Sequence, residues 1–261
     1  MTGGIQLNLD RELAILTIDR SGARNALDTQ SIAEFGATVA RIEANDAIAA
    51  IVVTGANGTF CAGADLDEIA KTRAAYEPWA GATGPLAKRC AKPVIAAVEG
   101  HAVAGGLGVA LWADLRVASE TAVFGVFCRR LGVPMSDGTP TRLPAVVGRA
   151  RALDMLLTGR PIAADEAQRI GLADRVVPAG TALDAAKALA REISAFPSLA
   201  MASDRAAAWA AFDDDEAMRL IGEEKSARAA KAQEAAIGAA RFKAGEGRGG
   251  AAIEKISKLD S

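Results

Sequence analysis

The chain has 261 residues, of which 51% are hydrophobic and 24% charged, a composition that supports a sizeable buried core and excludes intrinsic disorder over most of its length. Its 30 Lys and Arg against 32 Asp and Glu leave a formal net charge of −2, which favours neither nucleic acid nor an anionic membrane as a partner. The first residues do not show the basic region followed by an apolar run that is typical of a secretory signal. The longest apolar stretches, 47–53 and 93–98, are too short to cross a membrane. The three cysteines, Cys61, Cys90 and Cys128, have neither disulfide nor metal-ligand spacing. We therefore expect a cytoplasmic protein that holds no metal.

The N-terminal part of the chain predicts a hairpin, a helix and a buried strand. Two runs of alternating apolar residues, 5–9 and 14–18, predict an antiparallel hairpin with one buried face. From residue 30 to residue 42 the apolar positions recur at helical spacing, and residues 48–53 then form a continuous apolar run that predicts a buried strand.

The same alternation continues to about residue 197. The sequence predicts strands over 93–98, 115–118 and 176–178 and helices over 103–112, 152–157 and 163–170. Strands that alternate with helices are typical of an α/β domain with parallel strands. Beyond that point the chain is rich in alanine at helical spacing. We therefore place an α/β core over 1–197 and a C-terminal helical region over 198–261.

Two clusters of small residues follow predicted strands, over 60–66 (FCAGADL) and 100–108 (GHAVAGGLG). Each leads into a helix, with Asp65 a good N-cap for a helix over 66–72. Helix N-termini present unpaired backbone N–H groups, and two of them converging on one oxygen form an oxyanion hole. The alternative is that these glycines serve only tight turns and helix packing.

Both clusters, together with further blocks in the same order, resemble the crotonase (enoyl-CoA hydratase/isomerase) superfamily. The resemblance spans about residues 5–180 and is carried by residues 18–27 (IDRSGARNAL), 60–66, 92–106 (KPVIAAVEGHAVAGG), 124–125, 142–148, 157–160 and 163–177. It implies a spiral of ββα units with a C-terminal helical trimerisation region, assembled as a homotrimer or as a hexamer made of two trimers. The implied substrate is an acyl thioester of coenzyme A, with no separate cofactor.

The resemblance also implies the position of the substrate. The thioester oxygen would lie between the backbone N–H groups of Ala64 and Gly105. The residues implied to line the path of coenzyme A are Ala23, Arg24, Ala62, Ala64, Asp65, Leu66, Gly105 and Cys128. For Arg24 a solvated loop cation is an equal alternative.

This chain lacks both glutamates that act as acid and base in the family's hydratases. Gly108 and Cys128 stand at those two positions, and neither supplies a carboxylate. Asp137 is the best candidate for a proton carrier, because relatives that isomerise or dehalogenate place an aspartate in this loop, although the ungapped match puts theirs opposite Ser136. The alternative is that Asp137 only starts an Asp-Gly turn.

Cys128 is either a nucleophile or, more commonly for such a residue, a small buried hydrophobe. His101, the single histidine, is expected to pack behind the oxyanion hole. Tyr76 and Trp79 lie in the stretch that covers the acyl tail in the family, and they either limit its length or belong to the core.

Three functions remain open from the sequence. The first is an enoyl-CoA hydratase/isomerase-type enzyme that stabilises a thioester enolate and uses Asp137 to move a proton. The second is an acyl-CoA-binding homologue without catalysis, suggested by the absence of both glutamates. The third is an acyl-CoA thioester hydrolase in which Asp137 or Cys128 attacks the substrate.

Overall fold

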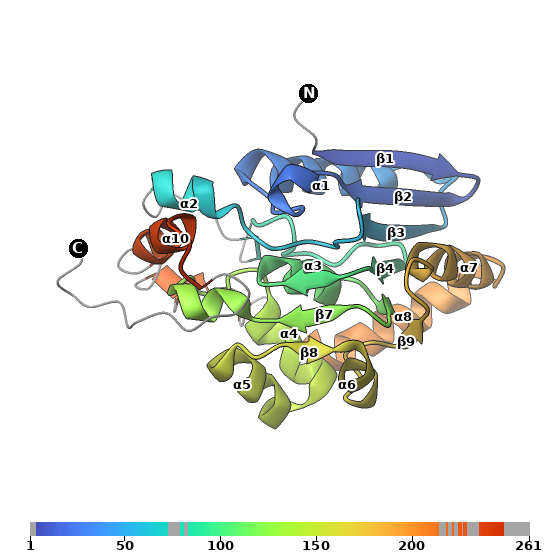
Figure 1. Cartoon of the computed structure of the whole chain (residues 1–261). Coiled ribbons are helices and arrows are strands. Elements are labelled where there is room, and N and C mark those ends of the chain that lie inside the picture. The colour runs from blue at the N-terminus through green and yellow to red at the C-terminus, as the bar shows by residue number, and fades with distance from the viewer. Residues whose placement is uncertain are drawn as a thin grey trace.

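The computed structural model describes residues 4–72, 79–80, 83–213, single positions between 218 and 228, and 235–247. Figure 1 shows a central sheet with helices on both sides and a group of helices beyond a second, smaller sheet. Within the described residues, no helix is both long enough and apolar enough to span a membrane.

The main sheet has six strands in the order β1-β2-β3-β4-β6-β9. Its strands are β1 (Ile5–Asp10), β2 (Leu13–Ile18), β3 (Ala50–Gly55), β4 (Val94–Val98), β6 (Leu115–Ser119) and β9 (Arg175–Val177). β1 and β2 pair antiparallel, whereas every other neighbouring pair is parallel. The predicted hairpin and the predicted parallel strands are thus confirmed, but β2 is buried on both faces rather than on one.

Alternation along β2 divides the core into two layers. Leu16 and Ile18 face one layer, which also contains the buried side of helix α1 (Thr29–Glu43), because successive side chains of a strand point to opposite faces. Leu13 and Ile15 face the other layer, beneath helix α7 (Ala182–Ser194). The central strands are buried on both faces, which explains why their sequences are continuous apolar runs.

The chain also forms a second sheet of three short strands. It contains β5 (His101–Val103), β7 (Val123–Gly125) and β8 (Ile162–Ala163), with β5 and β7 parallel and β7 and β8 antiparallel. The prediction of a helix from residue 103 was wrong at its start, because Val103 ends β5 and helix α3 (Gly105–Trp112) begins two residues later. The backbone of 101–103 is held extended by hydrogen bonds to Cys61 and by its pairing with β7.

The remaining helices surround these sheets. They are η1 (Ser21–Ala23), α2 (Leu66–Thr72), η2 (Phe127–Leu131), α4 (Thr139–Val147), α5 (Arg149–Thr158), α6 (Ala164–Arg169), α8 (Ser198–Asp213) and α10 (Ala236–Lys243). Sequence reasoning missed α4, in which Pro140 and Pro144 mask the helical pattern, and α7, which lies inside the predicted core region.

The C-terminal segment returns to the core. Helix α10 lies beside α2, as both views show, and it also packs on η2. Its Gly238 rests against the backbone carbonyl of Leu131, an approach that a side chain would prevent. The boundary at residue 197, and an interface between subunits beyond it, stay predictions.

Candidate active site

The two clusters of small residues are joined by their backbones. Cys61 N–H donates to the carbonyl of His101 at 2.9 Å, and Val103 N–H donates to the carbonyl of Cys61 at 3.1 Å. This short parallel bridge ties the loop after β3 to strand β5, although the two segments are far apart in the sequence. The structure therefore brings the two predicted halves of the oxyanion hole together.

The loop that carries Ala64 is held from its other side by residues 24–27. Ala62 N–H donates to the backbone carbonyl of Arg24. Leu27 N–H donates to the carbonyl of Gly63, and Asp65 N–H donates to the carbonyl of Leu27. Burial increases along the residues implied to bind coenzyme A: Arg24 is exposed, residues 62 and 64–66 are half-buried, and Gly105 is buried. The predicted path of coenzyme A thus includes both an exposed residue and a buried one.

The N–H groups of Ala64 and Gly105 have no backbone acceptor among the described residues. They also lie near each other, since a Cβ built on Gly63, the residue before Ala64, would fall 2.8 Å from the nitrogen of Gly105. Gly63 has a φ of +99°, a conformation that glycine adopts without strain. Two such donors near each other, one of them at the N-terminus of α3, can stabilise an oxyanion.

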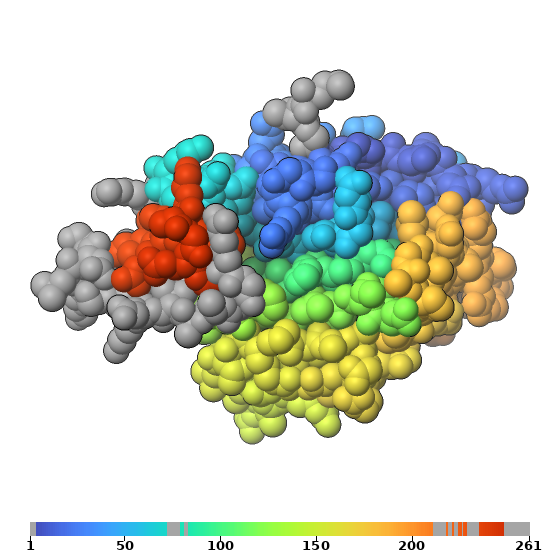
Figure 2. Space-filling model, viewed as in Figure 1, coloured from blue at the N-terminus to red at the C-terminus, as the bar shows by residue number. Residues whose placement is uncertain are grey.

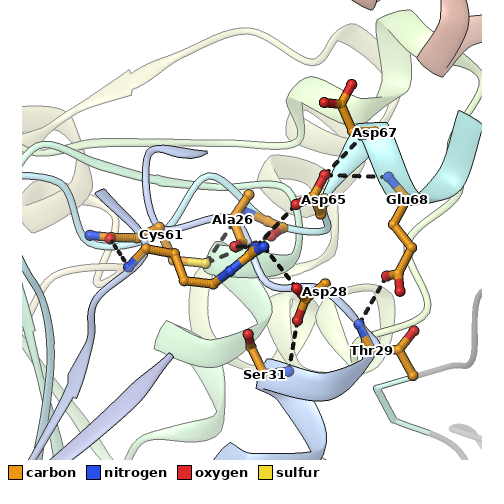
Figure 3. A network of polar contacts seen from close by, with 11 residues as sticks. Ala26, Asp28, Thr29, Ser31, Cys61, Asp65, Asp67 and Glu68 are labelled. Carbon is orange, nitrogen blue, oxygen red and sulfur yellow. Dashed lines mark hydrogen bonds and ion pairs between the residues drawn. The ribbon is translucent and has the colours of Figure 1, made fainter. Parts of the chain in front are cut away.

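A half-buried ion-pair network supports the same loop (Figure 3). Arg20 pairs with Asp65 at 3.1 Å and with Asp28 at 2.7 Å, and it also donates to the carbonyl of Ala26. Asp28 caps α1 by accepting from Ser31 N–H at 2.8 Å. Asp65 accepts from the first-turn N–H groups of α2, as the sequence predicted. Arg20 thus links the starts of two helices on either side of the Ala64 loop.

Asp137 lies at the start of α4, with only 1% of its surface exposed. Burial raises the pKa of its carboxyl to about 6, while the Thr139 N–H and hydroxyl and the nearby Arg142 lower it in part. The Thr139 N–H donates to Asp137 Oδ1 at 2.9 Å. The carboxyl touches Gly108 of α3, because a Cβ built on Gly108 would lie 2.6 Å from Asp137 Cγ. Gly108 and Gly105 are one turn apart on the same face of this helix.

Two buried thiols lie in the same region. Cys128 donates to the sulfur of Met135 at 3.0 Å, and Gly63 N–H donates to the sulfur of Cys61 at 3.4 Å. Burial raises the pKa of both thiols to about 12, and the negative charge of Asp137 contributes to that rise. Both therefore remain protonated at neutral pH. This environment opposes the nucleophilic reading of Cys128 and favours its reading as a small buried hydrophobe.

The profile described as enoyl-CoA hydratase/isomerase matches residues 9–245. The chain belongs to the enoyl-CoA hydratase/isomerase family. A probable enoyl-CoA hydratase of Mycobacterium bovis is 36% identical over 232 residues, which cover 88% of this chain and 90% of the relative. A short-chain-enoyl-CoA hydratase of Clostridium acetobutylicum is 35% identical over 192 residues, which cover 72% of this chain and 74% of the relative.

Solved structures agree with this assignment. A carnitinyl-CoA hydratase from Mycobacterium avium matches with a TM-score of 0.84 and 31% identity, covering 94% of this chain and 97% of that one. An enoyl-CoA hydratase from Mycobacterium tuberculosis H37Rv matches with a TM-score of 0.78 and 34% identity, covering 87% of this chain and 98% of that one. The resemblance to the crotonase superfamily and the predicted fold class are therefore confirmed.

One expectation for a residue near the site of this family member was wrong. His101 is exposed rather than packed behind the oxyanion hole, and its ring lies 6.5 Å from that of Phe127 in an edge-on contact. Partial burial and the positive charge of Arg24 lower the pKa of His101. The side chain turns outward because the neighbours Ala102 and Val103 supply the buried contacts of β5.

The residues expected to cover the acyl tail of the substrate are only partly described. Tyr76 lies outside the described residues. Trp79 is buried and its indole ring lies against Cα of Gly105, where a side chain would strike it. Its segment is held beside the Asp137 loop by a hydrogen bond from Ala80 N–H to the carbonyl of Ser136 at 3.0 Å.

Sequence reasoning missed two supporting residues of this family member. Arg20 was read only as part of a motif, and nothing local indicates that it pairs with Asp65, which lies 45 positions further along the chain. Asn25 is fully buried and donates to the carbonyls of Ala56 and Thr59, which fastens the 20–26 loop to the end of β3. Asn25 belongs to the block 18–27 that resembles the family, but the sequence does not reveal which carbonyls its side chain contacts. The catalytic and binding roles of the individual residues stay predictions.

Proposed function

We propose that this protein isomerises the double bond of an enoyl-CoA thioester, with Asp137 as the proton carrier. The observation that supports this most strongly is the position of one buried carboxyl on Gly108, one helical turn from the Gly105 N–H. Neither position 108 nor position 128 carries a carboxylate that would serve as a second acid or base. A single carrier suits a reaction that removes and returns one proton.

The proposed reaction has two steps that balance. The Asp137 carboxylate removes a proton from C2 of a 3-enoyl-CoA, and the electron pair moves onto the thioester oxygen as a dienolate. The N–H groups of Ala64 and Gly105 donate hydrogen bonds to that oxygen while it is negative. Asp137 then returns the proton to C4, which yields the 2-enoyl-CoA. No metal or redox cofactor takes part.

The environment of Asp137 fits a proton carrier. A catalytic acid or base works best when its pKa lies near the working pH, and burial brings the pKa of Asp137 to about 6. Coenzyme A would extend outward along residues 62–66 toward Arg24, which lies at the exposed end of the path.

Hydration is the second candidate, because relatives named enoyl-CoA hydratases match over most of this chain. The test is turnover of a panel of 2-enoyl-CoA and 3-enoyl-CoA thioesters, with each product identified by mass. Interconversion without a change of mass supports isomerisation, whereas a gain of the mass of water supports hydration. Release of free coenzyme A supports the hydrolase reading. Binding of every thioester without conversion supports an acyl-CoA-binding protein.

The role of Asp137 has its own test. We expect Asp137→Asn to lower kcat by about 10²-fold or more, the usual contribution of a positioned acid or base, while the Kd for butyryl-CoA stays within about threefold. Wild-type turnover by this variant would contradict the proton-carrier role.

A further inference from the structure

Helix α3 presents two glycines to two different side chains. Trp79 lies over Gly105, and the carboxyl of Asp137 lies over Gly108. A Cβ on Gly108 would stand 2.6 Å from Cγ, 2.8 Å from Cβ and 2.9 Å from Oδ1 of Asp137. Such distances are well inside van der Waals contact. A side chain at position 108 and a carboxyl at position 137 therefore compete for one volume.

The loop that carries Asp137 has little freedom to retreat. Asp137 is buried, and its Oδ1 accepts the hydrogen bond from Thr139 N–H at 2.9 Å. The preceding Ser136 is fixed through its carbonyl to Ala80 N–H. Gly138, which follows, has a φ of +88° and lies against the guanidinium of Arg142. An added methyl group at 108 would therefore turn the carboxyl away from Thr139 rather than move the loop.

Glycine is also a poor helix former, so a buried glycine inside α3 calls for a packing reason. Its contact with Asp137 supplies that reason. We propose that Gly108 is a positioning residue, whose missing side chain leaves the space from which the Asp137 carboxyl faces the substrate. The inference rests on the proposed function, because it assumes that Asp137 moves the proton.

The first experiment is Gly108→Ala, assayed with a 3-enoyl-CoA thioester across pH. We expect kcat to fall at least tenfold and KM to stay within about threefold. The low-pH limb of the kcat profile should move to higher pH, because the displaced carboxyl loses the Thr139 N–H that stabilises its charged form. Ala110→Gly, in the same buried helix, is the control: it should lower the Tm without moving kcat or the limb.

The second experiment exchanges the two positions. We expect Asp137→Gly to lose at least 100-fold in kcat, and the double variant Gly108→Asp with Asp137→Gly to recover at least tenfold of that loss. Aspartate at 108 would direct its carboxyl into the volume that residue 137 has left. Binding of butyryl-CoA, measured by calorimetry, verifies that each variant keeps its fold and its site.

An unchanged kcat and pH profile in Gly108→Ala would overturn the inference. So would an exchanged double variant that binds butyryl-CoA but recovers no turnover. The proposed function fails by a different result, which is wild-type turnover in Asp137→Asn. The two failures are therefore distinguishable.

Discussion

The buried Asp137 carboxyl fits the proposed proton transfer, but its burial lowers the free energy of unfolding of the protein. Its pKa is about 6 in the folded protein against 3.8 for an ordinary aspartate. Between these two pH values the folded state holds a proton that the unfolded state has released, so the free energy of unfolding decreases as the pH rises through that window. Above about pH 6 the full cost remains, on the order of 3 kcal/mol for a shift of about two units. Buried charged groups of this kind are characteristic of functional sites.

Asp137→Asn should raise the free energy of unfolding at pH 8 by about 1–3 kcal/mol, because the amide still accepts from Thr139 N–H but carries no charge. The gain should shrink toward zero near pH 4, where Asp137 is protonated. Urea unfolding at both pH values measures it. The exposed Asp46, replaced by Asn, is the control and should show no such gain at either pH. Equal stability of Asp137→Asn and the wild type at pH 8 would contradict this account.

Contacts between elements hold the two predicted donors in place. The loop after β3 and strand β5 meet at a bridge between Cys61 and Ala102, and this bridge aligns the Ala64 and Gly105 donors. Arg20 pairs with Asp28 and Asp65, the two aspartates that cap α1 and α2. Displacing either support should move the donors rather than remove them.

Gly63→Ala tests the loop. We expect turnover to fall about 10²-fold, the usual effect of losing one oxyanion-hole donor, because the new Cβ would press on Gly105 N. Gly180→Ala is the matched control. It also has a positive φ, but nothing lies within 4 Å of its Cβ position. Both variants should lose about 1–2 kcal/mol of stability through backbone strain. Equal loss of turnover in both would refute a specific role for Gly63.

Arg20→Ala tests how much the ion pairs of Arg20 with Asp28 and Asp65 stabilise the fold. Removal of this cation leaves two half-buried carboxylates without their partner, and we expect the free energy of unfolding to fall by about 1–3 kcal/mol. Arg169→Ala removes an exposed pair with Asp165 and should cost less than about 0.5 kcal/mol. Urea unfolding compares the two. A cost as small as that of Arg169→Ala would show that Arg20 is dispensable for the fold.

The two described helices of the C-terminal region differ in what they contact. Helix α10 packs on α2 and η2 of its own chain, on the side of the molecule that also carries Cys128. Helix α8, by contrast, begins with large apolar side chains in solvent: Phe196, just before it, is 56% exposed and Leu199 is 87% exposed. Adjacent exposed apolar residues are typical of a surface that another subunit covers.

The expected trimer or hexamer depends on that surface. Sedimentation should give three or six times the chain mass of 26.7 kDa. Leu199→Glu should lower the assembled mass, because a charge on that surface opposes burial. Leu9→Glu, at a 53% exposed position on β1, should leave it unchanged. A wild-type chain that sediments as a monomer would contradict the expected assembly.

Much of the fold could be predicted from the sequence, because its signals are local. Alternation in β1, the helical spacing of α1 and the apolar runs of β3 and β4 reflect which faces of each element are buried. Helix α4 was missed because its two prolines are not expected inside a helix. Strands β7 and β8 were missed because strands of three and two residues are too short to show a periodic pattern.

For the site, the order of residues alone reveals which groups are present: two clusters of small residues after strands, a capping Asp65, no carboxylate at 108 or 128, and an aspartate at 137. The three-dimensional fold was needed to show that the clusters meet at Cys61, that Arg20 reaches Asp65, and that the Asp137 carboxyl lies on Gly108. These contacts join residues 29 to 45 positions apart in the sequence, and backbone pairing and side-chain packing bring them together. Residue spacing does not encode such distances, whereas it does encode the face that each strand or helix buries.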